Sequence, residues 1–178
     1  MELLELRRNI RRAEHVKGYV VGIGKKWVLL AYMNFEEVKV DRYVAVRLAH
    51  IDRVKPVKNA GFPRRAIELR GQWPPTAPSQ PVDLDSTRRL IATAAGQSPL
   101  LNIEDENDAP NACYIGTVEQ LTDKTVTLFE VSPAAEWQRH GRWKLADLTW
   151  VEFGGPYDAA LLAVAGTPPP HDDHEVTH

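Results

Sequence analysis

A segment rich in glycine and lysine is the first place where this sequence could do chemistry. Residues 22–27 read GIGKKW, and glycines beside lysines can hold a phosphate. The spacing differs from the GxxxxGK[ST] of phosphate loops and no helix pattern follows, so the segment is typical of a hairpin turn. Lys25, Lys26 and Trp27 suggest another role, because cations beside an aromatic ring can hold single-stranded nucleic acid by charge and base stacking. The alternative is that Trp27 packs against the protein itself.

The C-terminal residues also carry side chains that can bind metal. The segment HDDHEVTH places His171, His174 and His178 among acidic residues, and both residue types are metal ligands. We expect residues 167–178 to be disordered, and a disordered segment would bind metal weakly and without selectivity. The sequence therefore predicts no cofactor and no functional metal site.

The remaining reactive residue types form no catalytic pattern. Cys113 is the single cysteine, which excludes an intrachain disulfide and any site of several cysteines, and its place in a predicted strand indicates packing. His15, His50 and His140 are scattered, and the acidic residues of 104–108 form a run rather than a spaced pair. Catalysis needs groups that converge in space. We therefore expect a protein that is not an enzyme.

Charge is distributed unevenly along the chain. Residues 1–70 hold 16 Lys and Arg against 8 Asp and Glu, a formal charge of +8, whereas the remainder holds 6 against 16, a charge of −10. This asymmetry has two explanations, which the sequence leaves open. The basic part could bind an anionic partner, or the two parts could attract each other within one chain or between subunits.

The N-terminal residues show a helical spacing of apolar side chains. Leu3, Leu6 and Ile10 are three and four residues apart, which predicts a short helix over residues 2–13. The arginines of this segment would surround the apolar stripe: Arg7, Arg8, Arg11 and Arg12. Such a helix can bind nucleic acid or a membrane, or it can lie across a small barrel with its arginines in solvent. The segment lacks the apolar stretch of a secretion signal, and no apolar run reaches the length of a membrane span, so we expect a cytoplasmic protein without a membrane partner.

Three pairs of similar segments predict an internal repeat. Residues 46–54 (VRLAHIDRV) match 143–151 (WKLADLTWV), residues 26–30 match 124–128, and Tyr19, Val21 and Ile23 match every second residue from Tyr114 to Val118. Both copies, over residues 17–55 and 112–153, alternate as strands do. A sheet of this size must curl to enclose a core, with LAHI and LADL as single helical turns before the last strand. The expected interior includes Ile23 and Val54.

The pattern resembles the Sm-like and SH3-like small barrels, including the Sm-type RNA-binding proteins of bacteria. Residues 114–118 (YIGTV) fit the apolar-x-Gly-x-apolar signature of their first strand, and the helix over 2–13 stands where theirs does. The polar loop signatures of Sm-type RNA binding are missing, because Arg47 and Lys144 each offer only a basic residue followed by Leu. The chain is also similar to bacterial proteins with a WVEFGG-like ending, a likeness that implies no function.

The expected fold is mainly β, with two small bent-sheet barrels and short flanking helices. Residues 1–58 form the helix and first barrel, and 111–166 form the second barrel and a short helix from Pro156 to Gly166. Between them, 59–110 is a proline-rich connection with an edge strand at 66–73 and a helix near 85–96, begun by Asp85 or Ser86 and ended by Gly96.

This architecture predicts a non-catalytic binding or assembly module that associates with itself or with another protein, most simply as a homo-oligomer. The alternative function is binding of RNA or single-stranded nucleic acid by the basic N-terminal part. Its candidate site comprises Lys25, Lys26, Trp27, Arg7, Arg8, Arg11 and Arg12.

Overall fold

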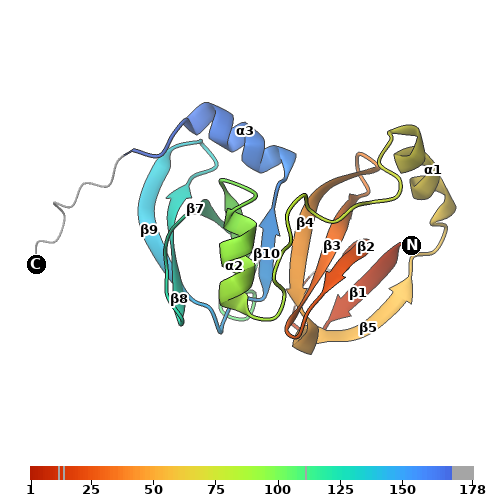
Figure 1. Ribbon diagram of the computed structural model, residues 1–178, viewed down its shortest axis with the longest axis horizontal. Coiled ribbons are helices and arrows are strands. Elements are labelled where there is room, and N and C mark those ends of the chain that lie inside the picture. The colour runs from red at the N-terminus through yellow and green to blue at the C-terminus, as the bar shows by residue number, and fades with distance from the viewer. Residues whose placement is uncertain (12, 14, 111, 170–178) are drawn as a thin grey trace, which may run out of the picture.

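The computed structural model describes residues 1–11, 13, 15–110 and 112–169, and these form a mainly β fold. One antiparallel sheet of ten strands runs through the described part of the chain, in the order β5-β1-β2-β3-β4-β10-β6-β7-β8-β9 (Figure 1). The strands are β1 (Leu4–Arg8), β2 (Val16–Ile23), β3 (Trp27–Asn34), β4 (Lys39–Arg47), β5 (Ile51–Pro56), β6 (Leu101–Glu104), β7 (Tyr114–Leu121), β8 (Thr125–Val131), β9 (Trp137–Lys144) and β10 (Trp150–Phe153). The expectation of a mainly β protein is confirmed.

The sheet consists of two halves of five strands that are connected in the same way. Strands β1 to β5 make up the first half in the order β5-β1-β2-β3-β4, and β6 to β10 make up the second half in the order β10-β6-β7-β8-β9. The central hairpins have a register shift at matching places, between Val20 and Gly22 in β2 and between Val118 and Gln120 in β7. A short turn precedes the last strand of each half, a 3-10 helix at Leu48–His50 and a turn at residues 145–147, as the sequence predicted.

The strand register corrects one of the three segment matches. Gly18, not Val21, takes the place of Gly116, because Gly18 lies opposite Tyr32 as Gly116 lies opposite Glu130. Both positions need glycine. A Cβ on Gly18 would stand 2.6 Å from the carbonyl oxygen of Ala31. A Cβ on Gly116 would overlap the carbonyl oxygen of Phe129. The match was displaced by three residues, because it followed the apolar residues of one strand and not the pairing with the next strand.

Two cores lie on opposite faces of the sheet, and one of them contains side chains of both halves. Val46 packs with Leu30 in the first core, whereas Val151 packs with Leu128 in the second. In the register between β4 and β10, Trp150 lies opposite Val46 and Val151 opposite Ala45. Because neighbouring residues of a strand point to opposite faces, Val46 and Val151 lie on different sides of the same sheet. Trp27, Leu29 and Ala45 belong to the same core as Val151, so the first half buries side chains on both faces of its strands.

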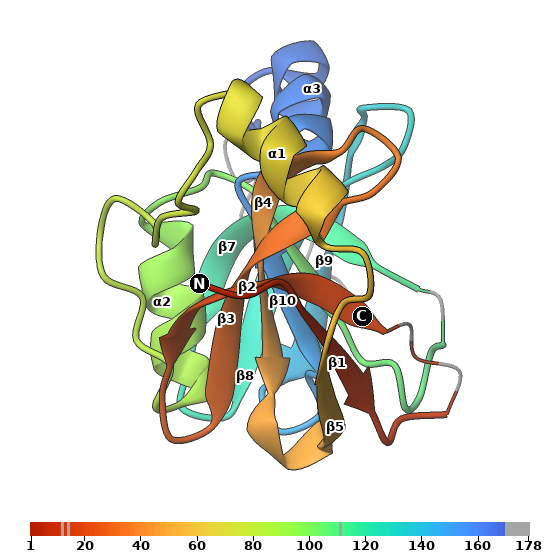
Figure 2. The ribbon, with the colours of Figure 1, turned by 90° about the vertical axis from the view of Figure 1, so that its right-hand side faces the viewer.

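The N-terminal segment is a strand rather than the predicted helix over residues 2–13. Strand β1 lies between β2 and β5 and pairs with both (Figure 2). Leu6 and Arg8 are buried while Arg7 is exposed, which is the alternation of a strand. The leucines fit a helix as well as a strand, but a short helix gains little stability alone, whereas a central strand finds hydrogen-bond partners on both sides.

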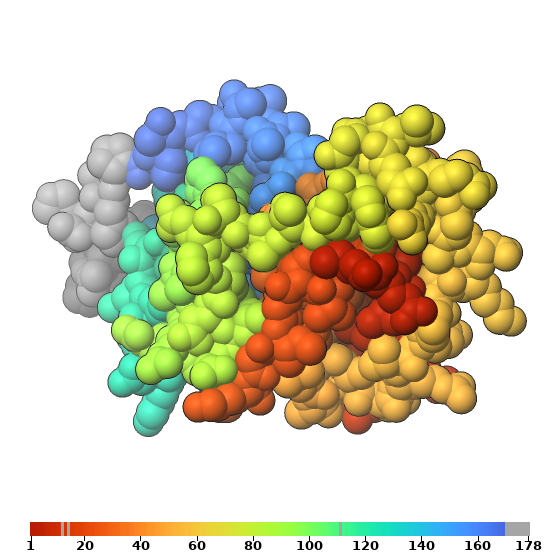
Figure 3. Space-filling view, turned by 45° about the vertical axis from the view of Figure 1, so that its right-hand side comes forward, coloured from red at the N-terminus to blue at the C-terminus, as the bar shows by residue number. Residues whose placement is uncertain are grey.

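The connection between the halves carries two helices instead of one. The expected edge strand at 66–73 is wrong, because α1 (Gly61–Leu69) spans most of it, with Pro63 in its first turn and Ile67 buried four residues later. The helix α2 (Thr87–Ala95) begins after Ser86, whose hydroxyl accepts a hydrogen bond from the Arg89 N–H, and ends at Gly96 as predicted. In Figure 3 the chain between α1 and α2 runs across the surface of the first half.

Three smaller expectations can also be compared with the structure. The helix α3 (Pro156–Ala165) has the predicted bounds within one residue, with Gly166 as its C-cap. Ile23 and Val54 are exposed rather than interior, since they lie at a hairpin end and on the outermost strand. Cys113 precedes β7 and is exposed, so its expected burial in a strand is wrong.

Candidate functional site

The two halves meet through a pair of strands, β4 and β10. Tyr43, Val44, Ala45 and Val46 lie opposite residues 153 to 150 in antiparallel register. Tyr43 also stacks on Phe153, with ring centroids 5.4 Å apart. We call this contact the β4–β10 junction. Main-chain hydrogen bonds and buried side chains therefore join strands that are about a hundred residues apart in the sequence.

Arg47 at the end of β4 fastens this junction. Its guanidinium donates hydrogen bonds to the backbone carbonyls of Leu148, Leu145 (2.6 Å) and Ala146 (3.0 Å), all in the turn before β10. The same group lies over the Trp27 ring, 4.9 Å from its centroid. Arginine suits this place because its several N–H groups can bond more than one carbonyl while its plane stacks on an aromatic ring.

A buried ion pair connects the halves beside the junction. The guanidinium of Arg8 in β1 donates to both carboxylate oxygens of Glu106, at 2.6 and 2.7 Å. Glu106 also accepts a hydrogen bond from the Thr149 hydroxyl at 2.7 Å, and Arg8 lies over the ring of Trp150. Both charged side chains are almost inaccessible to solvent. Removing one partner of such a pair is costly, because the other partner then remains as a buried charge without compensation.

A second ion pair lies within the junction itself. Arg42 Nε is 3.1 Å from a carboxylate oxygen of Glu152, and the guanidinium lies 3.9 Å from the centroid of the Tyr32 ring. Burial raises the pKa of Glu152 to about 7, although the charge of Arg42 acts in the opposite direction. Burial also raises the pKa of Asp158 in α3 to about 6.

The uneven charge of the chain is thus used partly within the molecule. Arg8 and Arg42 each bind an acidic residue of the other half, and Lys25 is 3.6 Å from Asp85 before α2. The sequence left two explanations for the uneven charge, an anionic partner or attraction between the two parts. These ion pairs are an example of attraction between parts of one chain.

A cavity of about 300 Å³ lies next to the β4–β10 junction. Its wall includes the members of both ion pairs, with Tyr32, Trp150 and Cys113. Four of the charged groups that line it are paired across the halves, Arg8 with Glu106 and Arg42 with Glu152. Within the described residues, no group of three or more His, Cys, Asp or Glu could hold a metal ion.

The predicted nucleic-acid residues do not form one surface. Trp27 is fully buried, and its indole N–H lies 3.3 Å from the Thr87 hydroxyl, so its ring cannot stack on a base. Lys25 and Lys26 are exposed in the turn between β2 and β3.

The arginines of the N-terminal segment are also separated from one another. Arg7 lies 3.6 Å from Asp52 on the face opposite to Arg8, and Arg11 is at the rim of the cavity. Arg12 and the three histidines of the tail, at 171, 174 and 178, lie outside the described residues.

The outer strands β5 and β9 are the feature that sequence reasoning did not locate. They form the two ends of the sheet, and each pairs on one side only within the described part of the chain (Figure 1). On β5, the Val57 N–H donates to the Leu3 carbonyl, so by alternation the backbone groups of Val54 and Pro56 point away from β1. Their polar sequences, IDRVKP and WQRHGRWK, are the one signal of an outer position.

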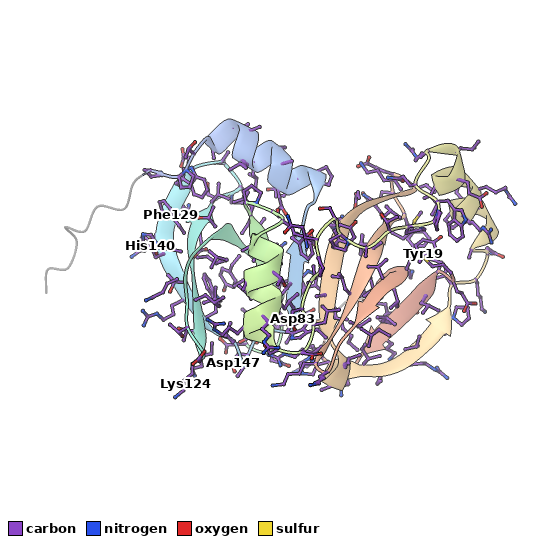
Figure 4. All side chains as sticks on the ribbon, in the orientation of Figure 1. Tyr19, Asp83, Lys124, Phe129, His140 and Asp147 are labelled. Carbon is purple, nitrogen blue, oxygen red and sulfur yellow. The ribbon has the colours of Figure 1, made fainter. Side chains whose placement is uncertain are left out.

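On β9, the Leu145 N–H donates to the Lys124 carbonyl at 2.8 Å. The backbone groups of His140, Arg142 and Lys144 therefore point outward. Figure 4 shows His140 beside Phe129 at this end of the molecule, where their rings stack at 4.6 Å. Both outer strands thus present N–H and C=O groups to whatever approaches in the plane of the sheet.

Comparisons with known proteins do not assign the chain to a family. No protein-family model matches it, and neither does any curated protein or solved structure. Among the described helices, none has the length and apolar character to cross a membrane.

Proposed function

We propose that this protein is a non-catalytic assembly module that binds further copies of itself through the outer strands of its sheet. One observation carries the proposal. The halves of the chain are already joined edge to edge by β4 and β10, while strands in the equivalent positions, β9 and β5, lie at the two ends of the sheet and pair on one side only among the described residues.

We also infer that each half is a small bent-sheet barrel of the Sm-like or SH3-like type, and that the halves arose as copies of one unit. Their identical strand order supports this, as do the matching register shifts and the equivalent glycines, Gly18 and Gly116.

Physical chemistry favours strand addition at these ends. An uncovered outer strand presents a row of unpaired N–H and C=O groups, and a further strand can satisfy them in a regular ladder. Strand β9 is eight residues long, which is enough for a substantial ladder. Its exposed charged side chains, such as Arg139 and Arg142, discourage indiscriminate pairing while leaving the backbone accessible.

The nucleic-acid alternative rested on the +8 charge of residues 1–70, on a basic N-terminal helix and on Lys25, Lys26 and Trp27. Two of these grounds are lost, because the N-terminal segment is a strand and Trp27 is buried.

Light scattering combined with size-exclusion chromatography tests the proposal. The wild-type chain should show a molar mass that rises with concentration. The double variant Val54→Pro/Arg142→Pro should be monomeric, because each proline removes an outward N–H and leaves the ladder to the neighbouring strand intact. The matched control Val54→Ala/Arg142→Ala keeps both N–H groups and should still associate.

Circular dichroism should show that both double variants are folded. A wild-type chain that stays monomeric at the highest soluble concentration contradicts the proposal. So does a double proline variant that is folded and associates as the wild type does.

A further inference from the structure

We infer that copies associate head to tail, with β9 of one copy pairing antiparallel with β5 of the next in the register of the β4–β10 junction. This inference rests on the proposed self-association and specifies which strands meet and how. The internal junction supplies the template, because β9 occupies in the second half the place that β4 has in the first, and β5 corresponds likewise to β10.

The direction of the backbone groups agrees with this template. In β4, the Leu48 N–H donates to the Lys26 carbonyl, so the backbone groups of Tyr43 and Ala45 point to β10. Their equivalents in β9 are His140 and Arg142, whose backbone groups point outward as shown above. The backbone N–H and C=O groups that β4 uses to bind β10 therefore have equivalents in β9 that point away from the sheet.

The same agreement holds on the other strand. Val151 and Phe153 lie opposite Ala45 and Tyr43 in the junction, and their equivalents in β5 are Val54 and Pro56. The backbone groups of both point away from β1. Pro56 lacks an N–H, so the inferred ladder has one hydrogen bond fewer than the internal one.

The template register brings compatible side chains together. It places Arg53 opposite Trp143, Val54 opposite Arg142, Lys55 opposite Gly141 and Pro56 opposite His140. No two cations face each other directly in this register. An arginine beside a tryptophan ring gains a cation–π contact.

Glu130 gives the register a specific charge complement. A Cβ on Gly141 would overlap both the Trp143 ring and the Glu130 carboxylate, so this carboxylate lies beside the place where Lys55 of the neighbouring copy would arrive. Glu130 has no ion-pair partner within the described residues, and its burial raises its pKa. In the internal junction the corresponding place is held by Glu152 with Arg42. Arg42 itself corresponds to Arg139 in β9, so the free edge provides its carboxylate from the neighbouring strand β8 instead.

Lys144 offers a counterpart to Arg47. The internal contact has Arg47 bonded to carbonyls of the turn before β10. Lys144 is exposed at the end of β9, and the equivalent acceptors are the carbonyls of the Leu48–His50 turn before β5. A lysine makes a weaker and less directional contact than an arginine, which fits an association that can reverse.

A head-to-tail contact uses different surfaces on the two copies, so it continues until a ring closes or a chain of copies grows. Contacts between identical edges are less favourable for β9, because two such strands would bring Arg139, Arg142 and Lys144 of both copies together without a carboxylate in either strand.

Mixing two singly blocked variants tests the inference. Val54→Pro leaves only β9 available and Arg142→Pro leaves only β5, so each variant should be monomeric alone. Mixed at equal concentrations they should form a complex of one copy each and nothing larger, as measured by sedimentation velocity. The variants Val54→Ala and Arg142→Ala are the controls and should each form the wild-type assemblies.

Disulfide cross-linking tests the register in the same mixture. On a Cys113→Ser background, a Val54→Cys chain and an Arg142→Cys chain should give a covalent dimer when mixed and oxidised. The pair Val54→Cys with Gln138→Cys should not, because the second position lies four residues along β9, roughly 13 Å away.

The outcomes separate this inference from the proposed function. If Val54→Pro or Arg142→Pro alone forms a dimer, pairing of identical edges or another surface is responsible, and the head-to-tail arrangement is wrong although self-association stands. A cross-link at Gln138 in place of Arg142 overturns the register. A wild-type chain that never associates overturns both.

Discussion

Strands β4 and β9 hold the same place in the two halves of the molecule but have different surroundings. Ala45 of β4 is fully buried because β10 covers that edge, whereas its equivalent in β9, Arg142, is exposed. Tyr43 and Ala45 of the covered edge are aromatic and small, whereas their equivalents on the free edge are His140 and Arg142. A permanent strand contact thus differs from an available one in its side chains, while the backbone offers the same groups in both.

The residue at the end of each strand shows the same contrast. Arg47 bonds three carbonyls and stacks on Trp27, while Lys144 is exposed. Trp27 itself has Thr125 as its equivalent, so the free edge has no ring to support an arginine. The first half therefore has a fixed contact at this place, and the second half has an exposed basic residue.

The largest effect is expected on breaking the ion pair that supports the covered edge. Glu106→Ala leaves the buried Arg8 without its bidentate partner and should lower the free energy of unfolding by about 3–5 kcal/mol. Urea denaturation measures this. The double variant Arg8→Met/Glu106→Leu should recover most of the loss, because no buried charge then remains. A loss below about 1 kcal/mol for Glu106→Ala would show that the pair does not hold the halves together.

The next effect concerns a carboxyl group that only the covered edge contains. The pKa of Glu152 is raised from 4.5 to about 7, so the folded chain binds a proton that the unfolded chain has lost between these pH values. The contribution of Glu152 to stability therefore falls as the pH rises through this window, by about 3 kcal/mol. Glu152→Gln should match the wild type near pH 4.5 and be more stable above pH 7. Chemical denaturation over this range checks the sign, and a wild-type advantage above pH 7 would refute it.

Substitution of the two equivalent glycines, Gly18 and Gly116, should lower the stability of the protein by similar amounts. Gly18→Ala and Gly116→Ala each force a Cβ against a carbonyl of the neighbouring strand, so each should lower the free energy of unfolding by about 2 kcal/mol. Gly61→Ala in α1, where a Cβ meets only the end of a flexible arginine, is the control and should have little effect. A large difference between the first two variants would argue against equivalent packing.

The smallest effects come from the two basic residues at the strand ends. Arg47→Ala removes hydrogen bonds to carbonyls across the junction and should cost about 2 kcal/mol in thermal or chemical unfolding. Lys144→Ala should change the stability of the monomer by less than about 0.5 kcal/mol, since surface substitutions have small effects. It should instead weaken self-association. Equal losses of stability in both variants would contradict the distinction between the covered and free edges.

Local patterns predicted much of the fold. Alternation identified both hairpins, and the residues flanking α2 and α3, Ser86 with Gly96 and Pro156 with Gly166, marked those helices. The failures share a cause. Leu4–Arg8 and residues 61–69 fit a helix or a strand locally, and what decides between them is a neighbour from elsewhere in the chain.

The candidate site was less predictable than the fold, because it is defined by strand neighbours. The junction pairs β4 with β10 across about a hundred residues, and nothing in residues 39–47 specifies that partner. The burial of Trp27 likewise depends on α2, whose Thr87 meets the indole N–H. The basic and acidic parts of the chain left open whether the halves attract each other or bind an anionic partner, and they did not show which residues pair.

Amide hydrogen exchange measured residue by residue at low and high protein concentration tests the central claim most directly. The amides of Val54 and Arg142 point outward in the monomer, so they should exchange fast when dilute and become protected as the concentration rises. Those of Ala45 and Val151, which belong to the internal junction, should be protected at every concentration. Unchanged exchange at Val54 and Arg142 in concentrated solution would contradict assembly through the outer strands.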